Sequence, residues 1–314
     1  MIEHAFGGDW TEDKLMRLGK YLAAYRSIFT SNAKARHFTT WYVDAFAGTG
    51  SRTASKSETS AFNLMDETYE DPESSGFRDG SARIALSLDS PFDRYLFIEK
   101  SKKRIAELQN DIHRDFAGLA VRCDLQRGDA NKLLCEWCQA RDWSKERAVV
   151  FLDPYGMQVE WSTVQALGAT KGIDLWYLFP LGVARMLTRD GVIEDSWRSR
   201  LTTLFGTADW EEKFYQTQIT PTLFGNLETL QRDATVETMQ GYINERLQTS
   251  FHSVAPSLVL RNSKDSPLFA LCFAAANERG APIAIKIAKS ILGKADVNSE
   301  GDIWLRHQLS NGQR

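Results

Sequence analysis

The sequence predicts an α/β protein with a doubly wound, mostly parallel sheet of seven strands that ends in an antiparallel hairpin. Apolar runs that end in an acid alternate with segments of helical periodicity from residue 41 to about residue 180, which is the pattern of repeated strand and helix units. Near the end of the chain, the strand-like runs Leu258–Arg261 and Leu268–Ala274 are separated by a short, turn-rich gap. Because this gap cannot hold a crossover helix, we expect these two strands to pair antiparallel.

Length and composition indicate an ordinary globular chain, which we interpret as one domain over residues 1–314. The chain is 43% hydrophobic and 25% charged, and its net charge is -3. Attraction of the whole surface to nucleic acid is therefore not expected, and any such binding must depend on a local basic face. No apolar run approaches the ~18 residues of a membrane span, and the amino terminus lacks a signal-peptide pattern, so we predict a cytoplasmic protein without a membrane segment.

The four cysteines predict neither a disulfide framework nor a metal site. Cys135 and Cys138 form a lone C-x-x-C inside a helical pattern, and no second pair is present to complete a tetrahedral zinc site. The five histidines are scattered, with no spacing typical of a metal site or a catalytic triad. We expect no metal.

The first strand of the predicted sheet runs into a glycine turn. An amphipathic helix from about Trp10 comes first, and the aromatic and β-branched run Trp41–Asp44 follows it and breaks into small residues that include Gly48 and Gly50. Glycine permits positive φ and lets a ligand approach the backbone closely, so the turn predicts a nucleotide-type pocket. The P-loop is excluded because Ser51 and Arg52 stand where it needs lysine and Ser or Thr, and the third glycine of the dinucleotide fingerprint is missing.

Acids also end or follow the next three predicted strands. Glu99 ends the second, Asp129 follows the weak third strand near residues 120–125, and Asp153 follows the apolar run Ala148–Leu152. An acid at the end of the second strand is well placed to accept both hydroxyls of an adenosine ribose. Two alternatives stay open, because Glu99 could be a solvated cap of the next helix and Asp129 could be an N-cap.

Two insertions interrupt the strand and helix units. Residues 53–80 are rich in Ser, Thr, Glu and Asp and lack clear periodicity, which predicts either a lid or a disordered segment. Residues 181–250 look helical and more polar, and we interpret them as a helical insertion that shapes the substrate side. Arginines cluster at its start, and we select Arg185 and Arg189 as substrate-binding candidates because guanidinium groups suit phosphate contacts. A solvated helix face is the alternative for this cluster.

Four sequence segments resemble those of a known family. They are Tyr42-Val-Asp-Ala-Phe-Ala-Gly-Thr-Gly50, Phe97-Ile-Glu-Lys100, Asp153-Pro-Tyr-Gly-Met-Gln-Val-Glu-Trp161 and Leu175-Trp-Tyr-Leu-Phe-Pro-Leu-Gly182. The chain resembles class I S-adenosylmethionine (SAM) methyltransferases and, more narrowly, the bacterial three-Cys-motif partner family, TcmP, over most of residues 10 to 290. The resemblance implies a Rossmann-like methyltransferase sheet, SAM as the cofactor, and a partner protein with a cysteine motif. It also implies that the cofactor is bound by Asp44, Phe46, Gly48, Gly50, Glu99, Asp129 and Ala130.

The segment Asp153-Pro154-Tyr155 predicts the catalytic end of the site. It is similar to the D-P-P-Y motif of amino-methylating enzymes, although it lacks the second proline, and it is closer to the D-P-F-G of tRNA guanine-N2 methyltransferases. An exocyclic amine is a poor nucleophile because its lone pair is delocalised into the ring. A carboxylate and a backbone carbonyl that accept its N–H bonds localise that pair, and an aromatic ring stacks on the base.

The sequence therefore predicts a SAM-dependent methyltransferase of an exocyclic amino group on a nucleic-acid base, with Asp153, Pro154 and Tyr155 as catalytic residues. Two alternatives remain. The chain could be a degenerate SAM-binding subunit that serves the cysteine-motif partner, or it could methylate a small molecule or a peptide amine, which the acidic net charge favours.

Overall fold

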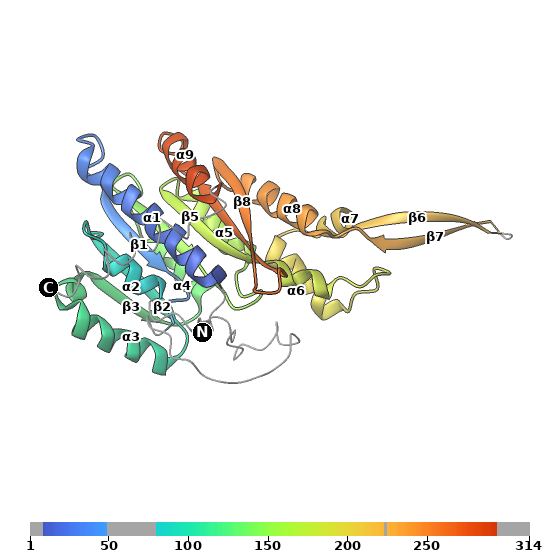
Figure 1. Cartoon of the computed structure of the whole chain (residues 1–314), viewed down its shortest axis with the longest axis horizontal. Coiled ribbons are helices and arrows are strands. Elements are labelled where there is room, and N and C mark those ends of the chain that lie inside the picture. The colour runs from blue at the N-terminus through green and yellow to red at the C-terminus, as the bar shows by residue number, and fades with distance from the viewer. Residues whose placement is uncertain (1–8, 49–79, 223–224, 294–314) are drawn as a thin grey trace, which may run out of the picture.

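The computed structural model describes residues 9–48, 80–222 and 225–293. Its main element is a seven-stranded sheet with the order β3-β2-β1-β4-β5-β9-β8 (Figure 1). The strands are β1 (Thr39–Asp44), β2 (Arg94–Glu99), β3 (Cys123–Arg127), β4 (Glu146–Leu152), β5 (Ile173–Pro180), β8 (Ser253–Arg261) and β9 (Pro267–Ala275). The five strands β1 to β5 pair in parallel, whereas β9 pairs antiparallel with both β5 and β8. The predicted fold class, with its antiparallel hairpin at the end of the sheet, is confirmed.

Helices cover both faces of this sheet. Buried side chains of α1 (Asp9–Ser31), α2 (Ser81–Leu86), α3 (Lys102–Asp115) and α9 (Ala281–Leu292) pack on one face, together with Tyr42 of β1. Those of α4 (Ala130–Gln139), α5 (Trp161–Ala169), α6 (Asp195–Phe205), α7 (Trp210–Phe214) and α8 (Val236–Gln248) pack on the other face, together with Trp41 and Val43. Successive residues of a strand point to opposite faces, so every strand in the middle of the sheet must be apolar on both sides, as the continuous run of β4 shows.

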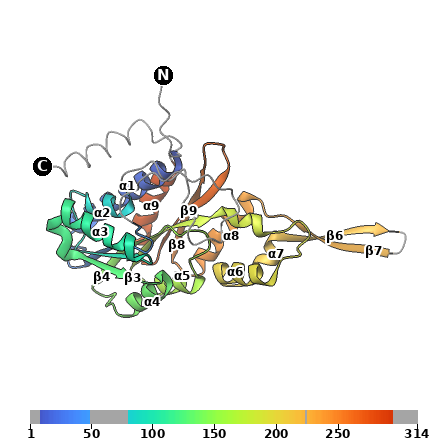
Figure 2. The ribbon, with the colours of Figure 1, turned by 90° about the horizontal axis from the view of Figure 1, so that it is seen from below.

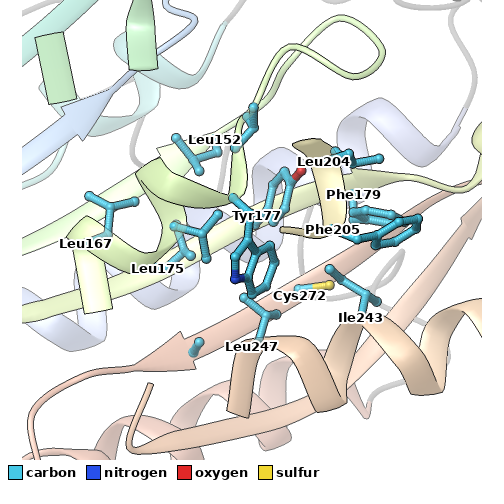
Figure 3. Close-up of a cluster of buried hydrophobic side chains, with 14 of the residues drawn as sticks. Leu152, Leu167, Leu175, Tyr177, Phe179, Leu204, Phe205, Ile243, Leu247 and Cys272 are labelled. Atoms are coloured by element: carbon cyan, nitrogen blue, oxygen red, sulfur yellow. The ribbon is translucent and has the colours of Figure 1, made fainter. Parts of the chain in front are cut away.

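The second of these two cores is the one that anchors the insertion after β5. Figure 3 shows Leu152 of β4, Leu175, Tyr177 and Phe179 of β5 and Cys272 of β9 against Phe205 of α6 and Ile243 and Leu247 of α8. Phe205 also contacts Phe214 and Tyr242 edge to face, with ring centroids 5.7 Å and 5.1 Å away. The helices of the insertion are therefore part of the same hydrophobic core as the sheet, and α6 is held in place beside the carboxyl end of β4.

The insertion after β5 differs from the predicted helical segment over residues 181–250. It begins with the 3-10 helix η3 (Leu181–Met186) and contains α6, α7 and α8, but β6 (Tyr215–Thr222) and β7 (Gly225–Arg232) form a separate antiparallel pair between them. This two-stranded arm projects away from the body of the protein in both views (Figures 1 and 2). Tyr215 at the base of β6 packs in the core, whereas the described side chains of the arm beyond it are exposed. Exposed strands need no apolar face, so the arm lacks the period-two hydrophobic signal that reveals a strand in a sequence.

Other boundaries differ by a few residues. The third strand begins at Cys123, because residues Ala117–Arg122 form the 3-10 helix η2 instead of the start of the strand. Most of the predicted lid or disordered segment over residues 53–80, and the predicted cofactor residue Gly50, lie outside the described residues. Within the part of the chain that is described, no helix is long and apolar enough to cross a membrane.

We predict opposite effects for alanine at two helix-associated glycines. Gly206 caps α6 with φ of 72°, and a Cβ there would lie 2.2 Å from Cδ1 of Trp161. Gly206→Ala should lower the free energy of unfolding by about 2–3 kcal/mol, because it combines backbone strain with a clash in a packed core. Gly241→Ala, inside α8 with no atom within 4 Å of the new Cβ, should raise it by about 0.5–1 kcal/mol. Urea unfolding of both variants checks this, and an equal effect of the two would refute the assignment of strain to Gly206.

Candidate functional site

A cavity of about 320 Å³ lies at the carboxyl edge of the sheet. Because β1 to β4 are parallel, their carboxyl ends meet at this edge, where doubly wound proteins bind their ligands. The cavity lies between the ends of β1, β2 and β3, the loop after β4, and α6. Its lining consists of Ala45, Phe46, Glu99, Lys100, Arg104, Gly128, Asp129, Ala130, Asn131, Tyr155, Met157, Gln158, Glu160, Ser199, Arg200 and Thr203.

Five of the predicted site residues line this cavity, namely Phe46, Glu99, Asp129, Ala130 and Tyr155. Among the other described candidates, Asp44, Gly48, Asp153 and Pro154 belong to the same edge of the sheet but do not line the cavity. The candidate residues therefore fall into an open cleft and a more buried group beside it.

Asp44 belongs to the buried group and organises the turn after β1. Its side chain is fully buried, and it accepts hydrogen bonds from the backbone N–H of Phe46 at 3.2 Å and from the hydroxyl of Ser81 at the start of α2. Burial raises the pKa of Asp44 from its ordinary 3.8 to about 6, and the negative charge of Asp153 adds to this shift. Within the described part of the chain, Asp44 therefore stabilises the turn after β1 through these hydrogen bonds and does not face the cleft.

Glu99 joins the glycine turn to the cleft. Oε2 accepts the backbone N–H of Gly48 at 3.1 Å, and Gly48 has φ of 60°, a conformation that favours glycine. Oε1 accepts the N–H of Ser101 at 2.7 Å and pairs with the guanidinium of Arg104 at 3.2 Å. The carboxylate is thus oriented by the backbone, and a ligand hydroxyl that bonded to Oε1 would share it with Arg104.

The amino end of α4 forms another side of the cleft. Asp129 caps this helix by accepting the N–H of Lys132 at 3.0 Å, as the N-cap alternative predicts. Asp129 also lines the cleft. The next residue but one, Asn131, donates to the carbonyl of Gln158 at 2.8 Å and accepts the N–H of Glu160 at 2.9 Å. Asn131 therefore ties the loop after β4 to α4.

That loop carries Tyr155 into the cleft. Gly156, directly after it, has φ of 60° and allows the tight reversal behind the tyrosine. The guanidinium carbon of Arg104 lies 5.8 Å from the centroid of the Tyr155 ring, within the range of a cation–π contact. The ring and the guanidinium together form a flat wall of the cleft beside Glu99.

Asp153, two residues before Tyr155, faces a different neighbour. Its Oδ2 lies 2.6 Å from Nζ of Lys14 in α1, and the side chains of Lys14 and Asp153 are only 1% and 15% exposed. This buried ion pair attaches the first turns of α1 to the carboxyl end of β4.

The predicted substrate arginines lie elsewhere. Arg185 in η3 and Arg189 after it are exposed and do not line the cleft. Arg200 of α6 does, together with Ser199 and Thr203 one turn away, because α6 packs beside the loop after β4. The clustering of arginines signalled a basic segment, but which arginine reaches the cleft depends on the packing of α6.

Two functional candidates were not predicted from the sequence, namely Lys14 and Arg104, whereas Arg200 belongs to the predicted arginine cluster but is not one of the two arginines selected from it. A signal for Lys14 was available, since it stands four residues before Leu18 on the apolar face of α1, where a lysine is unexpected. Arg104 had no such signal, because its role depends on the turn between Glu99 and α3.

The cleft combines acceptors on one wall with cations on another. Glu99 and Asp129 can accept hydroxyl and amino hydrogens, the ring of Tyr155 can stack on a planar group, and Lys100, Arg104 and Arg200 supply positive charge. This combination suits a nucleoside-containing ligand. Among the described residues, no group of three or more His, Cys, Asp or Glu could hold a metal ion.

Comparisons with known proteins find similarity at the level of structure. A protein of Legionella pneumophila is 12% identical and covers 79% of this chain and 94% of its own, with a TM-score of 0.37. A SAM-dependent methyltransferase of Clostridium acetobutylicum is 10% identical over 82% and 92%, with a TM-score of 0.34, and a methyltransferase of Geobacter sulfurreducens is 15% identical over 68% and 78%, with a TM-score of 0.29. No family model and no curated protein matches the sequence, so the resemblance to the three-Cys-motif partner family stays a prediction.

We predict that Asp44 makes stability depend on pH between about 4 and 6. Its pKa of about 6 exceeds the ordinary 3.8, so the folded protein binds this proton more tightly than the unfolded chain. The stability that protonated Asp44 contributes is fully present below pH ~4 and is lost as the pH rises through ~6. The difference in unfolding free energy between wild type and Asp44→Asn should therefore fall by about 3 kcal/mol from pH 4 to pH 7.

Urea unfolding of both proteins across this range measures the difference. Asp174, whose pKa burial also raises to about 6, is present in both proteins and cancels. A difference that does not change with pH would contradict the buried placement of Asp44.

Proposed function

We propose that the protein is a SAM-dependent methyltransferase that acts on an exocyclic amino group of a nucleic-acid base. The observation that carries this proposal is the loop after β4. A carboxylate, a proline and an aromatic side chain follow one another there as Asp153, Pro154 and Tyr155, and Tyr155 lines a cleft whose other walls carry Glu99 and Asp129.

The cofactor part of the proposal depends on the donor and acceptor set of the cleft. Glu99 is held in a fixed orientation by two backbone N–H groups, as an acceptor for ribose hydroxyls should be. Asp129 and Ala130 at the start of α4 would bind the adenine edge, and Phe46 would pack on the adenosine. When bound, SAM supplies an electrophilic methyl group on a sulfonium.

The reaction requires little proton transfer by the protein. With SAM bound, the amine nitrogen would form a bond to the methyl carbon while the bond from carbon to sulfur broke and its electron pair stayed on sulfur. The methylated nitrogen then loses a proton to solvent. Asp153 and the backbone carbonyl of Pro154 would accept the N–H bonds of the amine, and these bonds strengthen as the nitrogen becomes cationic. Alignment of the amine supplies the remaining rate enhancement.

The nucleic-acid part of the proposal is supported by charge and by stacking. The net charge of the chain is -3, and the cleft is lined by Lys100, Arg104 and Arg200 together with Glu99, Asp129 and Glu160. Phosphate contacts would therefore depend on these cations individually and not on a net basic face. A flipped base stacked on Tyr155 would gain about 1–3 kcal/mol. Affinity for such a substrate should fall steeply with salt, whereas affinity for a small neutral substrate should not.

We expect labelled methyl groups to pass from SAM into DNA or RNA, and not into protein or small molecules alone. Asp153→Ala should lower turnover by about 100-fold or more while SAM affinity stays within a factor of about 3. Tyr155→Ala should mostly weaken binding of the nucleic acid, by about 5- to 150-fold for a loss of about 1–3 kcal/mol.

Transfer assays with DNA, tRNA, total RNA and a protein extract in parallel measure this. Asp124→Ala, which removes an exposed acid of β3 away from the cleft, is the matched control. Label found only in protein or small molecules, or unchanged turnover in Asp153→Ala, would overturn the proposal.

A further inference from the structure

Lys14 is a buried lysine whose ammonium group pairs with Asp153, a predicted catalytic residue. Its Nζ donates to Oδ2 of Asp153 at 2.6 Å and lies 4.8 Å from the centroid of the Trp10 ring. The two ends of the ion pair are separated by 139 residues in sequence, so the pair exists only in the folded protein. Lys14 belongs to none of the sequence motifs that predict the site.

Stability alone does not account for this lysine. An ammonium group taken out of water is costly, and apolar residues of similar volume often replace a buried ion pair without loss of stability. The neighbours of Lys14 in the first turn of α1 are also unusual. The indole N–H of Trp10 and the hydroxyl of Thr11 are buried, and neither has a hydrogen-bond partner in the part of the chain that the structure describes. Buried polar groups in this turn cost stability, so we look for the role of Lys14 at the carboxyl edge of the sheet.

The charged groups around Lys14 indicate what this role is. Asp44 and Asp153 lie at the same edge of the sheet, and burial together with the charge of Asp153 raises the pKa of Asp44. Lys14 adds a positive charge to this pair of acids at a hydrogen-bonding distance from one of them. The ammonium of Lys14 therefore lies next to the carboxylate that the proposed reaction uses.

We propose that Lys14 is a positioning residue for methyl transfer, which holds the Asp153 carboxylate in a single orientation. The inference rests on the proposed function of Asp153. Lys14 occupies one acceptor position on Oδ2, and an ionised carboxylate offers about four such positions in all. The bond to Lys14 is therefore compatible with a second bond from the amine of a substrate. Lys14 itself forms no bond to the substrate and transfers no proton.

An anchored carboxylate has a specific consequence for the reaction. The hydrogen bonds to the amine must strengthen while the nitrogen becomes cationic, and a group already fixed in place needs no reorganisation at that moment. Loss of the anchor should therefore lower kcat more than it changes the KM of the nucleic acid, since the base is bound mainly by stacking and by phosphate contacts.

The test compares Lys14→Met, which keeps the volume and removes the charge, with Lys14→Arg, which keeps the charge. Lys14→Met should lower kcat about 100-fold, as expected for a misplaced catalytic group, while the Kd of SAM and the KM of the nucleic acid change by less than about threefold. Lys14→Arg should recover at least about a tenth of wild-type kcat. Lys20→Met, a partly exposed lysine in the same helix, is the matched control and should behave as wild type.

A second measurement separates this inference from the proposed function. Urea unfolding of Lys14→Met, Asp153→Asn and the double variant forms a double-mutant cycle. The unfolding constant of the double variant should differ by at least about threefold from the value expected if the two substitutions acted independently. Wild-type kcat in Lys14→Met, or loss of SAM binding and of substrate binding to the same extent as kcat, would overturn the positioning role alone. Absence of transfer by the wild type to every acceptor would overturn the proposed function, and with it this inference, even if the coupling is found.

Discussion

Four carboxyl groups at one edge of a parallel sheet must each find donors there, and this requirement governs the surrounding structure. Parallel pairing brings the ends of β1 to β4 together, and a buried carboxylate without hydrogen bonds is costly. This cost applies to Asp44, Glu99 and Asp153, whereas Asp129 is exposed. Asp44 and Glu99 use backbone N–H groups of the β1 turn, Asp129 uses the first turn of α4, and Asp153 uses Lys14 of α1. Elements that are distant in sequence are therefore fixed at this edge by its acids.

The same acids divide the edge into two regions with different properties. Glu99 and Asp129 face an open cleft with Tyr155 and Arg200, whereas Asp44 and Asp153 are withdrawn from it and compensated by hydroxyl and ammonium groups. In our proposal the first region binds the adenosyl part of the cofactor and the base that stacks on Tyr155, and Asp153 of the second region accepts the N–H bonds of the amine that is methylated. The packing of α6 and α8 on the core places Arg200 across the cleft from these acids, so the insertion after β5 would determine which substrates enter.

Features that repeat along the chain could be predicted from the sequence, and features that depend on distant contacts could not. The apolar runs that end in Asp44, Glu99 and Asp153 identified the strands and their edge, because a buried strand leaves a clear pattern. The arm formed by β6 and β7 left no such pattern, since its described side chains beyond Tyr215 are exposed. Arg185 and Arg189 were selected from clustering alone, and the exposed positions of both side chains reflect the path of the chain after β5. Lys14 needed both the helical periodicity of α1 and the position of Asp153, which only the fold provides.

The central claim is that the carboxyl edge of the sheet binds SAM through Glu99, and calorimetric titration tests it most directly. Wild type should bind SAM or its demethylated product, and Glu99→Ala should bind at least about tenfold more weakly, because hydrogen bonds to a charged acceptor contribute about 1.5–3 kcal/mol. Glu107→Ala, which removes a partly exposed acid of α3 that does not line the cleft, should bind as wild type does. Equal affinity of wild type and Glu99→Ala, or no binding by wild type at millimolar SAM, would contradict the account.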